Sequence, residues 1–436
     1  MPRKMKDSGV SWIGQIPENW SLGRTKNCYT NAKQVAGEEA DNYERLALTL
    51  NGVIKRPKDD ATGLQPEAFN GYQILRKNEL VFKLIDLANV ATSRVGYSPY
   101  EGIVSPAYII LHPKNEEESK FGEFYFLSMW QREIFNHMGD DGVRSSLNAG
   151  ELLNIPYPLV PSDEKKRIAQ FLDKQCAEID TVIAKTKATI EEYKKLKQSI
   201  ITDAVTKGIH GNREIKETGI KWIGSIPKNW SVRKLKTFAS LISKGATPKD
   251  ISNEQTSIYN IRFLKSENIV DNQLNSVPEF YIEEHIHLGE LKRSALTIDD
   301  ILFVIAGASI GKVAIMNADL LPSNTNQAVS FIRIMPKYSA IKKYIWYVLQ
   351  SDMIKTYISL FSVQSAQPNI SMENLGNFRM PYANDNEEIL EMIEYLDKKC
   401  TEIDTLIAKK TALLEEMETY KKSVIYEYVT GKKEVE

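Results

Sequence analysis

The sequence predicts an α+β protein, built as a pseudo-two-fold internal repeat, in which two long antiparallel coiled-coil helices join two mixed α/β domains. Two repeated segments support this. Residues 8–21 (SGVSWIGQIPENWS) and 218–231 (TGIKWIGSIPKNWS), here called the tags, agree at nine of fourteen positions. Residues 171–185 and 395–409, the shared helical segments, agree at eleven of fifteen. The sequence between them differs, so we expect one duplicated scaffold that carries two divergent domains.

Apolar residues recur at helical spacing through each shared helical segment, which predicts a coiled-coil seam. The pattern continues through Leu196 to Ile200 in the first copy and through Tyr420 to Val424 in the second. A helix of about 40 residues extends for roughly 60 Å and cannot bury its apolar face alone. We expect the two seams to pack on each other; the alternative is two separate helices, each packed on its own domain. The seam residues are Leu172, Cys176, Ile179, Ile183, Ile190, Tyr193, Leu396, Cys400, Ile403, Ile407, Leu414 and Met417.

The chain divides into four expected segments. Residues 1–161 form the first domain, 162–216 the first long helix, 217–383 the second domain, and 384–436 the second long helix. Ser162 and Asn384 are the expected N-caps, and Gly208 and Gly431 are expected to follow the last helical turns. Within the domains, β-rich runs and aromatic helical runs predict mixed structure. The strands are expected at residues 79–85, 103–111, 301–305 and 328–334, and the helices at 121–137 and 341–359.

Composition favours a folded protein, because 42% of the 436 residues are hydrophobic and 26% are charged. No apolar run is long enough to span a bilayer, and none follows the N-terminus as in a signal peptide. The three cysteines (Cys28, Cys176 and Cys400) are odd in number and far apart, which is typical of the reducing cytoplasm. We expect Cys176 and Cys400 to act as small apolar residues of the seam.

Charge is distributed unevenly along the chain. The net charge is −2 for residues 1–161, +3 for 162–216, +4 for 217–383 and −6 for 384–436. A protein that gripped a long duplex unaided would be more basic. We therefore expect either no nucleic-acid binding or a partner that supplies much of the phosphate contact.

No catalytic or metal-binding pattern stands out. His285 and His287 lack a further ligand cluster, and a catalytic zinc site requires three protein ligands. Residues 307–313 (GASIGKV) have three residues between the glycines where a phosphate-binding loop has four, and Val313 stands where such a loop has Ser or Thr. This segment is expected to be a turn between strands. Residues 163–166 (DEKK) are expected to favour the dipole of a helix start. We predict that the chain is not an enzyme and holds no metal.

The order of tag, variable block and LDK-x-C-x-EID-T helix, present twice, resembles the specificity subunit of type I restriction–modification enzymes over nearly the whole chain. The resemblance implies that each domain is a target recognition domain that reads half of a split, asymmetric double-stranded DNA target, with the paired helices setting the spacing. It further implies that two methyltransferase (modification) subunits dock on the helices and that restriction subunits join them. S-adenosylmethionine, ATP and Mg²⁺ would belong to those partners. This chain has Pro-Ser-Asp-Glu-Lys where the family often has Pro-x-x-Glu-Gln, which puts local contacts at the helix entrance in doubt.

Base identity in DNA is read mainly by bidentate Arg–guanine and Asn/Gln–adenine pairs, so polar and basic loop residues are the candidate DNA contacts. Each could touch a base edge or a phosphate, or be a solvated surface residue. The tag tryptophans are expected to pack in the scaffold, because a part common to both copies cannot encode different half-sites. The candidates are Lys55, Arg56, Lys83, Arg94, Arg144, Ser145, Lys244, Thr247, Arg262, Lys265, Lys312, Asn326 and Gln364.

Two other functions remain open from the sequence. A coiled-coil adaptor with protein-binding domains would show no sequence-dependent protection of DNA. A fused enzyme would methylate DNA without a partner, although the Asn-Pro-Pro-aromatic tetrapeptide of amino-methyltransferases is missing from the sequence.

Overall fold

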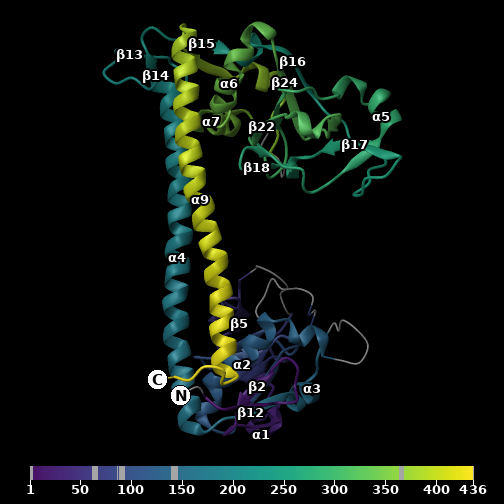
Figure 1. The fold of residues 1–436 in the computed structure, drawn as a ribbon, viewed down its shortest axis with the longest axis vertical. Helices are drawn as coiled ribbons and strands as arrows, with labels where there is room; N and C mark the ends of the chain where they lie inside the picture. Colours follow the sequence, from purple (N-terminus) through teal and green to yellow (C-terminus); the bar gives the residue numbers. More distant parts are fainter. Residues whose placement is uncertain are drawn as a thin grey trace. The chain divides into compact units, whose positions relative to one another are not determined.

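The computed structural model describes residues 3–60, 67–85, 87, 94–138, 146–362 and 368–435 (Figure 1). The chain forms two compact units. Unit 1 comprises Met1–Lys187 and Ala412–Glu436, and unit 2 comprises Ala188–Thr411. Each unit therefore contains one α/β domain together with part of each long helix, whereas the expected segments gave each helix a range of its own.

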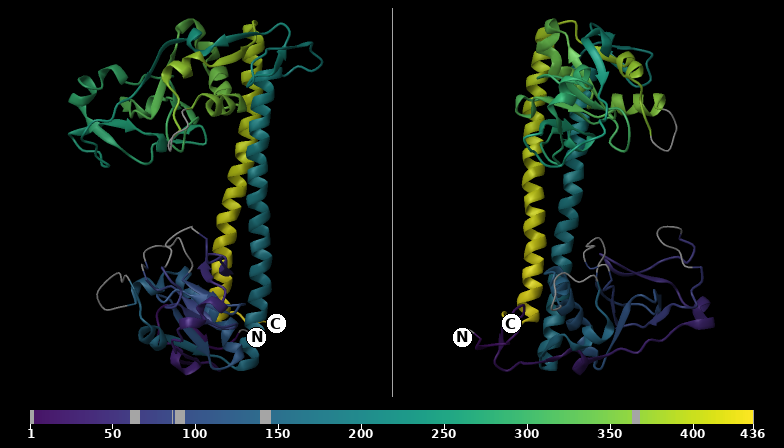
Figure 2. Two further views of the ribbon diagram at one scale, coloured as in Figure 1. Left: turned by 180° about the vertical axis from the view of Figure 1, so that it is seen from behind. Right: turned by 90° about the vertical axis from the view of Figure 1, so that its right-hand side faces the viewer.

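The two long helices are α4 (Ser162–Lys207) and α9 (Asn386–Val429), each an unbroken ribbon in Figure 2. Gly208 and Gly431 follow their last turns with φ of 77° and 69°, as expected for residues that end a helix. The expected N-caps were wrong. Ser162 is the first helical residue of α4. Before α9, the Asp385 carboxylate accepts a hydrogen bond from the Glu387 amide at 3.0 Å, in the place expected for Asn384.

Segments of α4 and α9 pair with each other inside each unit. In unit 1, Lys421 contacts Asp180 at 2.7 Å and Lys187 contacts Glu418 at 3.5 Å, so residue numbers rise along one helix and fall along the other. This is an antiparallel pair. In unit 2, Lys197 contacts Asp404 at 2.6 Å. Asp404 and Lys197 occupy the repeat positions of Asp180 and Lys421, so the two ion pairs are equivalent under the internal repeat. The alternative of two unpaired helices is therefore wrong.

The seam residues fall into two groups by burial. Leu172, Cys176, Ile179, Ile190, Leu396, Cys400 and Ile403 are buried, and Ile183, Tyr193, Ile407, Leu414 and Met417 are partly buried. Leu172 and Cys176 belong to the core of unit 1, and Leu396 and Cys400 to the core of unit 2, so the ends of the seam also contribute to the domain cores. Leu196 and Tyr420, at equivalent positions, are 49% and 51% exposed, so the seam does not include them.

The two domains contain the same four-stranded antiparallel sheet, although their sequences diverge. In unit 1 the strand order is β4 (Tyr29–Thr30), β11 (Ile109–Pro113), β8 (Leu80–Phe82) and β9 (Val95–Tyr97). In unit 2 the order is β16 (Ala239–Lys244), β24 (Val329–Ile334), β21 (Ile301–Val304) and β22 (Val313–Ile315). The expected strands at 79–85, 301–305 and 328–334 correspond to β8, β21 and β24. The run 103–111 is divided between β10 (Gly102–Val104) and β11.

Aromatic helices cover these sheets. In unit 1, α2 (Glu116–Gln131) is followed by the 3-10 turn Ile134–His137, close to the expected 121–137. In unit 2 the expected helix 341–359 is two helices, α6 (Lys342–Val348) and α7 (Asp352–Phe361). The Ser351 hydroxyl donates to the Val348 carbonyl at 2.7 Å, in the break between them. Side-chain bonding of this kind competes with the helical backbone pattern.

The tags form matching hairpins whose tryptophans Trp20 and Trp230 are each 1% exposed, as expected for scaffold residues. None of the described helices combines the length and apolar character needed to cross a bilayer. The strand pairs of the tags are β1 (Met5–Asp7) with β2 (Gln15–Pro17), β3 (Ser21–Arg24) with β12 (Pro156–Leu159), β13 (Ile215–Glu217) with β14 (Ser225–Pro227), and β15 (Ser231–Lys234) with β25 (Arg379–Tyr382).

Smaller sheets and short helices complete each domain. The sheets are β5 (Leu46–Thr49) with β6 (Gly52–Lys55), β7 (Gln73–Leu75) with β10, β18 (Ile269–Val270) with β19 (Gln273–Leu274), and β17 (Tyr259–Leu264) between β20 (Tyr281–Glu283) and β23 (Ser323–Thr325). The short helices are α1 (Thr25–Cys28), α3 (Ala149–Asn154), α5 (Glu284–Leu288) and α8 (Met372–Asn377).

Candidate nucleic-acid interface

Several candidate DNA contacts gather at one edge of the second domain's sheet. Lys244 is the last residue of β16 and pairs with Ser330 near the start of β24. Val304, the last residue of β21, also pairs with the start of β24, and its amide donates a hydrogen bond to the carbonyl of Lys312, just before β22 begins, at 2.9 Å. Because these strands are antiparallel, Lys244 and Lys312 leave the sheet at the same edge. Both side chains are exposed.

A second pair of candidates reaches this edge from the smaller sheet. Strands β17 and β23 run parallel, with Leu264 opposite Thr325. Lys265 and Asn326 therefore follow their strands side by side, and the Asn326 amide donates to the Leu264 carbonyl at 3.3 Å. The Lys265 ammonium lies 3.5 Å from the centre of the Phe280 ring. Such a cation–π contact holds the side chain while leaving its charge in place.

Gly245 joins the two groups. A Cβ added to this residue would lie 1.7 Å from the Thr325 carbonyl oxygen, so only glycine allows the two segments to approach so closely. The Gly245 amide donates to the Val329 carbonyl at 3.3 Å. Two residues later, the Thr247 hydroxyl donates to the side-chain carbonyl of Gln327. The loop after β16 is thus fixed against the loop after β23. Gln327 was missed in the sequence, because only the register of β17 and β23 reveals its place.

We define the second-domain edge as Lys244, Thr247, Lys265, Lys312, Asn326 and Gln327. Five of these six are sequence candidates, and the set combines cations with hydroxyl and amide groups that suit phosphate and base contacts. Arg262 lies apart within β17, where its guanidinium donates to the Ser276 carbonyl and contacts Glu279 at 3.4 Å. Gln364 lies outside the described residues.

The candidates of the first domain are placed differently. Lys55, at the end of β6, forms an ion pair with Glu44 at 2.5 Å, and Arg56 forms one with Asp60 at 2.7 Å. Lys83, half-buried, follows β8. Arg94 is 0% exposed and donates to the Ile85 carbonyl at 3.0 Å, so its guanidinium points into the protein. This placement argues against Arg94 as a DNA contact. Arg144 and Ser145 lie outside the described residues.

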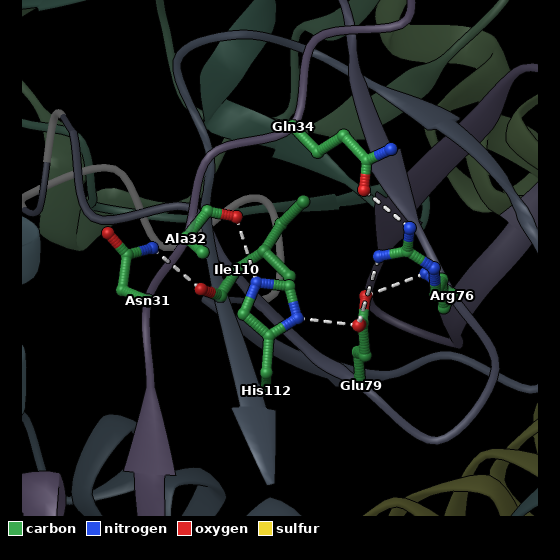
Figure 3. Close-up of polar contacts among 7 residues, drawn as sticks. All are labelled: Asn31, Ala32, Gln34, Arg76, Glu79, Ile110 and His112. Atoms are coloured by element: carbon green, nitrogen blue, oxygen red, sulfur yellow. Dashed lines mark hydrogen bonds and ion pairs between the residues drawn. The ribbon is translucent and has the colours of Figure 1, made fainter.

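A polar network that the sequence did not reveal holds the segment after β4 (Figure 3). His112 of β11 donates through Nδ1 to Glu79 at 2.5 Å and through Nε2 to the Ala32 carbonyl at 2.9 Å. Both ring nitrogens face acceptors, which favours the cation, and the hydrogen bond to Glu79 raises the pKa of His112. Arg76 bonds Glu79 and Gln34 in the same network. The network therefore holds Ala32 and Gln34, just after β4, against His112 and Arg76.

The shared helical segments make the same contacts in both copies of the repeat. The aspartate of the LDK sequence pairs with a lysine of the aromatic helix, as Asp173 with Lys120 at 3.2 Å and Asp397 with Lys343 at 2.5 Å. The aspartate of the EID sequence forms the pairs between α4 and α9 described above. The cysteine between them is buried, and burial raises the pKa of both Cys176 and Cys400 to about 11. Neither thiol is activated as a redox group, and the motif serves packing and docking.

The other motifs singled out in the sequence have structural partners. Residues 307–312 form the expected turn between β21 and β22, which begins at Val313, with φ of 87° at Gly307 and 90° at Gly311. His285 contacts Glu283 at 3.1 Å, whereas the His287 ring hydrogen-bonds the Asn324 side chain at 2.6 Å. Within the residues that the structure describes, no three His, Cys, Asp or Glu side chains gather as a metal site would require.

Comparison with known proteins identifies the family. The family model described as "Type I restriction modification DNA specificity domain" matches residues 30–192 and, a second time, residues 227–415. The chain belongs to this family. It is a type I restriction–modification specificity subunit with two DNA-recognition domains, one in each matched region.

Similarity to other specificity subunits extends over most of the chain. The type I restriction enzyme MjaVIII specificity subunit of Methanocaldococcus jannaschii is 24% identical over 432 residues, which cover 96% of this chain and 94% of that protein. The EcoKI specificity subunit of Escherichia coli K12 is 23% identical, covering 88% and 83%. A solved chain from "Structural basis underlying complex assembly and conformational transition of the type I R-M system" superposes with a TM-score of 0.67 at 14% identity, over 95% of this chain and 98% of that one. The fold of the specificity subunit is therefore shared over nearly its full length.

Proposed function

We propose that this specificity subunit is a non-catalytic reader of a bipartite, asymmetric DNA target, with one half-site bound by each recognition domain. One observation carries the proposal. The two domains share their sheet order and the Lys–Asp contacts by which they dock on the long helices, yet they present different residues at the strand ends. A common scaffold with different edges suits the reading of two different base sequences.

In the second domain, the second-domain edge supplies the contacts. Asn326 and Gln327 carry the amide groups that pair with adenine, and Thr247 has a hydroxyl that bonds either donors or acceptors on base edges. The lysines of the edge supply charge for phosphates. The Gly245 contact and the Thr247–Gln327 hydrogen bond support this role, because a pre-formed loop loses little conformational freedom on binding.

The long helices set the distance between the half-sites in this proposal. Helical backbone is rigid over many turns, and each residue adds about 1.5 Å. The equivalent ion pairs Asp180–Lys421 and Asp404–Lys197 support a fixed antiparallel register between α4 and α9. A domain held at the wrong distance would miss its bases, so the target would have a defined spacer.

Partner subunits supply the chemistry in this proposal. Two methyltransferase subunits dock on the helices and restriction subunits join them, with S-adenosylmethionine, ATP and Mg²⁺ bound by those partners and not by this chain. The modest charge of the chain, −1 overall, supports a division of the phosphate contacts between this chain and its partner subunits. The names of the similar proteins, each a specificity subunit of a type I restriction enzyme, support the same assembly.

A block exchange tests the modular reading. Residues 22–158 are replaced by the corresponding block of another specificity subunit, and methylated adenines are mapped in cells that also express the methyltransferase subunit. We expect one half of the methylated sequence to change and the other to persist. If both halves changed, the domains would not read independently. If neither the original chain nor the exchanged chain conferred sequence-dependent methylation, the adaptor function would replace this proposal.

A deletion tests the spacing. Removing four residues, about one helical turn, from α4 between Ile179 and Ile200 shortens one helix while it keeps the apolar face in phase. We expect the spacer of the methylated target to change or methylation to stop. A matched deletion at the corresponding place in α9 serves as the control, because it should affect the spacer similarly. An unchanged spacer in both variants would refute a role of the helices in spacing.

A further inference from the structure

The basic residues of the two recognition domains differ in how they are neutralised. At the second-domain edge, the exposed Lys244 and Lys312 have no carboxylate partner within 4.0 Å among the described residues. Lys265 rests on Phe280 without an ion pair in the described part of the chain. The positive charges of this edge are thus available to an anion.

In the first domain, two of the described candidates, Lys55 and Arg56, already have anionic partners, and a third, Arg94, is buried. Lys55 pairs with Glu44 and Arg56 with Asp60, while the neighbouring Lys58 pairs with Asp41 at 3.6 Å. Arg94 points into the interior. A phosphate that approached Lys55 or Arg56 would have to compete with a carboxylate that is already in place, so each of these residues would gain less from binding.

Among the described residues, the acidic residues that closely follow the edge in sequence form no ion pair with its lysines. Asp250 is exposed in the loop after β16, and Glu267 accepts a hydrogen bond from its neighbour Ser266 at 3.0 Å. Over the whole regions the difference persists, because residues 217–383 carry a net charge of +4 and residues 1–161 a net charge of −2.

We propose that the two half-sites are held unequally: the second domain anchors the chain on the DNA backbone through Lys244, Lys265 and Lys312, and the first domain adds sequence discrimination with little phosphate neutralisation of its own. The inference rests on the proposed function, since it assigns different shares of DNA binding to the two recognition domains. Its ligand is the phosphate backbone flanking the half-site of the second domain.

Salt dependence separates the two kinds of contact. Each phosphate neutralised by a lysine releases counterions, so log K falls with log salt with a slope of about −0.9 per contact on duplex DNA. Loss of an anchoring lysine therefore makes the slope shallower by about 0.9 and weakens binding to all sequences alike. Loss of a lysine that stays paired with its own carboxylate leaves the slope nearly unchanged.

The experiment measures binding of the full chain, assembled with its cognate methyltransferase subunit, to a duplex that contains the methylated target, between about 50 and 200 mM NaCl. The variants are Lys244→Ala and Lys312→Ala, with Lys55→Ala as the matched control in the first domain. We expect slopes shallower by about 0.9 for each of the first two and nearly unchanged for the third. Lys312→Arg should keep the original slope, because arginine retains the charge.

The outcomes distinguish the inference from the function on which it rests. An equal change in slope for Lys55→Ala and for the second-domain variants, or no change for any of them, would overturn unequal anchoring while sequence-specific binding persisted. Failure of the unmodified assembly to prefer its target over a scrambled duplex would instead count against the proposed function. Thermal denaturation of each variant verifies that it is folded. The substituted residues Lys55, Lys244 and Lys312 are all exposed, so we expect melting temperatures close to that of the unmodified chain.

Discussion

The Trp20 indole N–H donates a hydrogen bond to the Glu164 carboxylate at 2.9 Å, across 144 residues of sequence. The second copy repeats the contact, with Trp230 donating to Glu388 at 3.1 Å. An arginine completes each group, since Arg3 contacts Glu164 at 2.5 Å and Arg213 contacts Glu388. Each tag is thereby bound to the first turn of the long helix that follows its domain.

The other end of each tag contact explains why the tags match so closely. A Cβ on Gly431, after the end of α9, would lie 2.9 Å from the Trp20 ring, and one on Gly208, after α4, would lie 3.3 Å from the Trp230 ring. In each unit the tag tryptophan therefore packs where one long helix begins and the other ends. A residue with these two neighbours serves the scaffold, so both copies retain it.

We predict that Trp20→Phe destabilises unit 1 by about 1–3 kcal/mol, because it leaves a buried carboxylate oxygen of Glu164 without its donor. Amide hydrogen exchange, which resolves local unfolding, should show the loss at the start of α4 and not in unit 2. In the double variant Trp20→Phe/Glu164→Gln, we expect a coupling free energy of about 0.5–3 kcal/mol. Additive effects of the two substitutions would show that the hydrogen bond contributes nothing.

A buried ion pair distinguishes the two helix starts. The Lys165 ammonium donates to Glu118 of α2, and the two residues are 4% and 3% exposed. The repeat position of Lys165 in the second copy is Ile389, also fully buried. Lys165 stands where the family often has glutamine. The contact that this departure put in doubt, at the entrance of α4, is therefore an ion pair with α2 of the recognition domain. Tyr157 also donates to Glu118, at 2.8 Å.

We predict that Lys165→Ile alone destabilises the chain by about 3–5 kcal/mol, because it leaves the Glu118 carboxylate buried without a cation. The double variant Glu118→Leu/Lys165→Ile should recover most of this loss, since apolar replacement of both partners is often neutral or better. Urea denaturation followed by tryptophan fluorescence measures both. A double variant as unstable as the single one would show that packing, and not the unpaired charge, causes the loss.

Local patterns in the sequence predicted the long helices, because the seam repeats within a few residues and its burial is decided by helical periodicity. The tags were predicted as scaffold for a different reason, because a segment that is the same in both copies cannot encode different half-sites. The pairs Glu118–Lys165 and Glu79–His112 could not be predicted. Their partners are 47 and 33 residues apart, and neither pair belongs to a repeated motif.

Residue type selected the candidate DNA contacts, but it could not place them in the fold, and their contact with DNA stays a prediction. Residue type alone selected Lys244, Lys265, Lys312 and Asn326, and the strand register then placed them at one edge. Residue type also selected Arg94, because the identity of a residue and a loop-like sequence around it do not reveal the direction of its side chain. The equivalence of the two four-stranded sheets could not be predicted from the sequence. Two sheets can keep the same strand order while the individual residues of their strands diverge, as long as the buried positions stay apolar.

We predict that the three cysteines react slowly with thiol reagents in the folded chain. All three are buried, and burial raises the pKa of Cys28 to about 12 and of Cys176 and Cys400 to about 11. At about pH 8, roughly one thiol in a thousand of pKa 11 is ionised. Labelling with iodoacetamide should therefore require unfolding and become fast in concentrated urea. Rapid labelling of Cys176 or Cys400 without denaturant would indicate that the helix pair opens readily.

We predict that the contribution of His112 to stability depends on pH. Its folded pKa is raised by Glu79, so the contribution is complete below the unfolded pKa of about 6.5 and is lost as pH rises through the folded value. His112→Gln should therefore cost more stability at about pH 6 than at about pH 9. Thermal denaturation at the two pH values measures the difference, and an equal cost at both would exclude a charged His112.

We predict that Gly245→Ala impairs recognition of the second half-site while the first is still read. The added Cβ would clash with the Thr325 carbonyl oxygen at 1.7 Å, so the loop after β16 must move away from Asn326 and Gln327. Gly211→Ala is the control, because nothing lies within 4 Å of its added Cβ and its φ is not in the left-handed region. Binding of the assembled complex is compared on duplexes in which either half-site is scrambled. For Gly245→Ala, scrambling the second half should matter less than it does for the unmodified chain, whereas scrambling the first half should matter as before. If the variant kept full discrimination at both halves, the close approach of Gly245 to Thr325 would have no part in base reading.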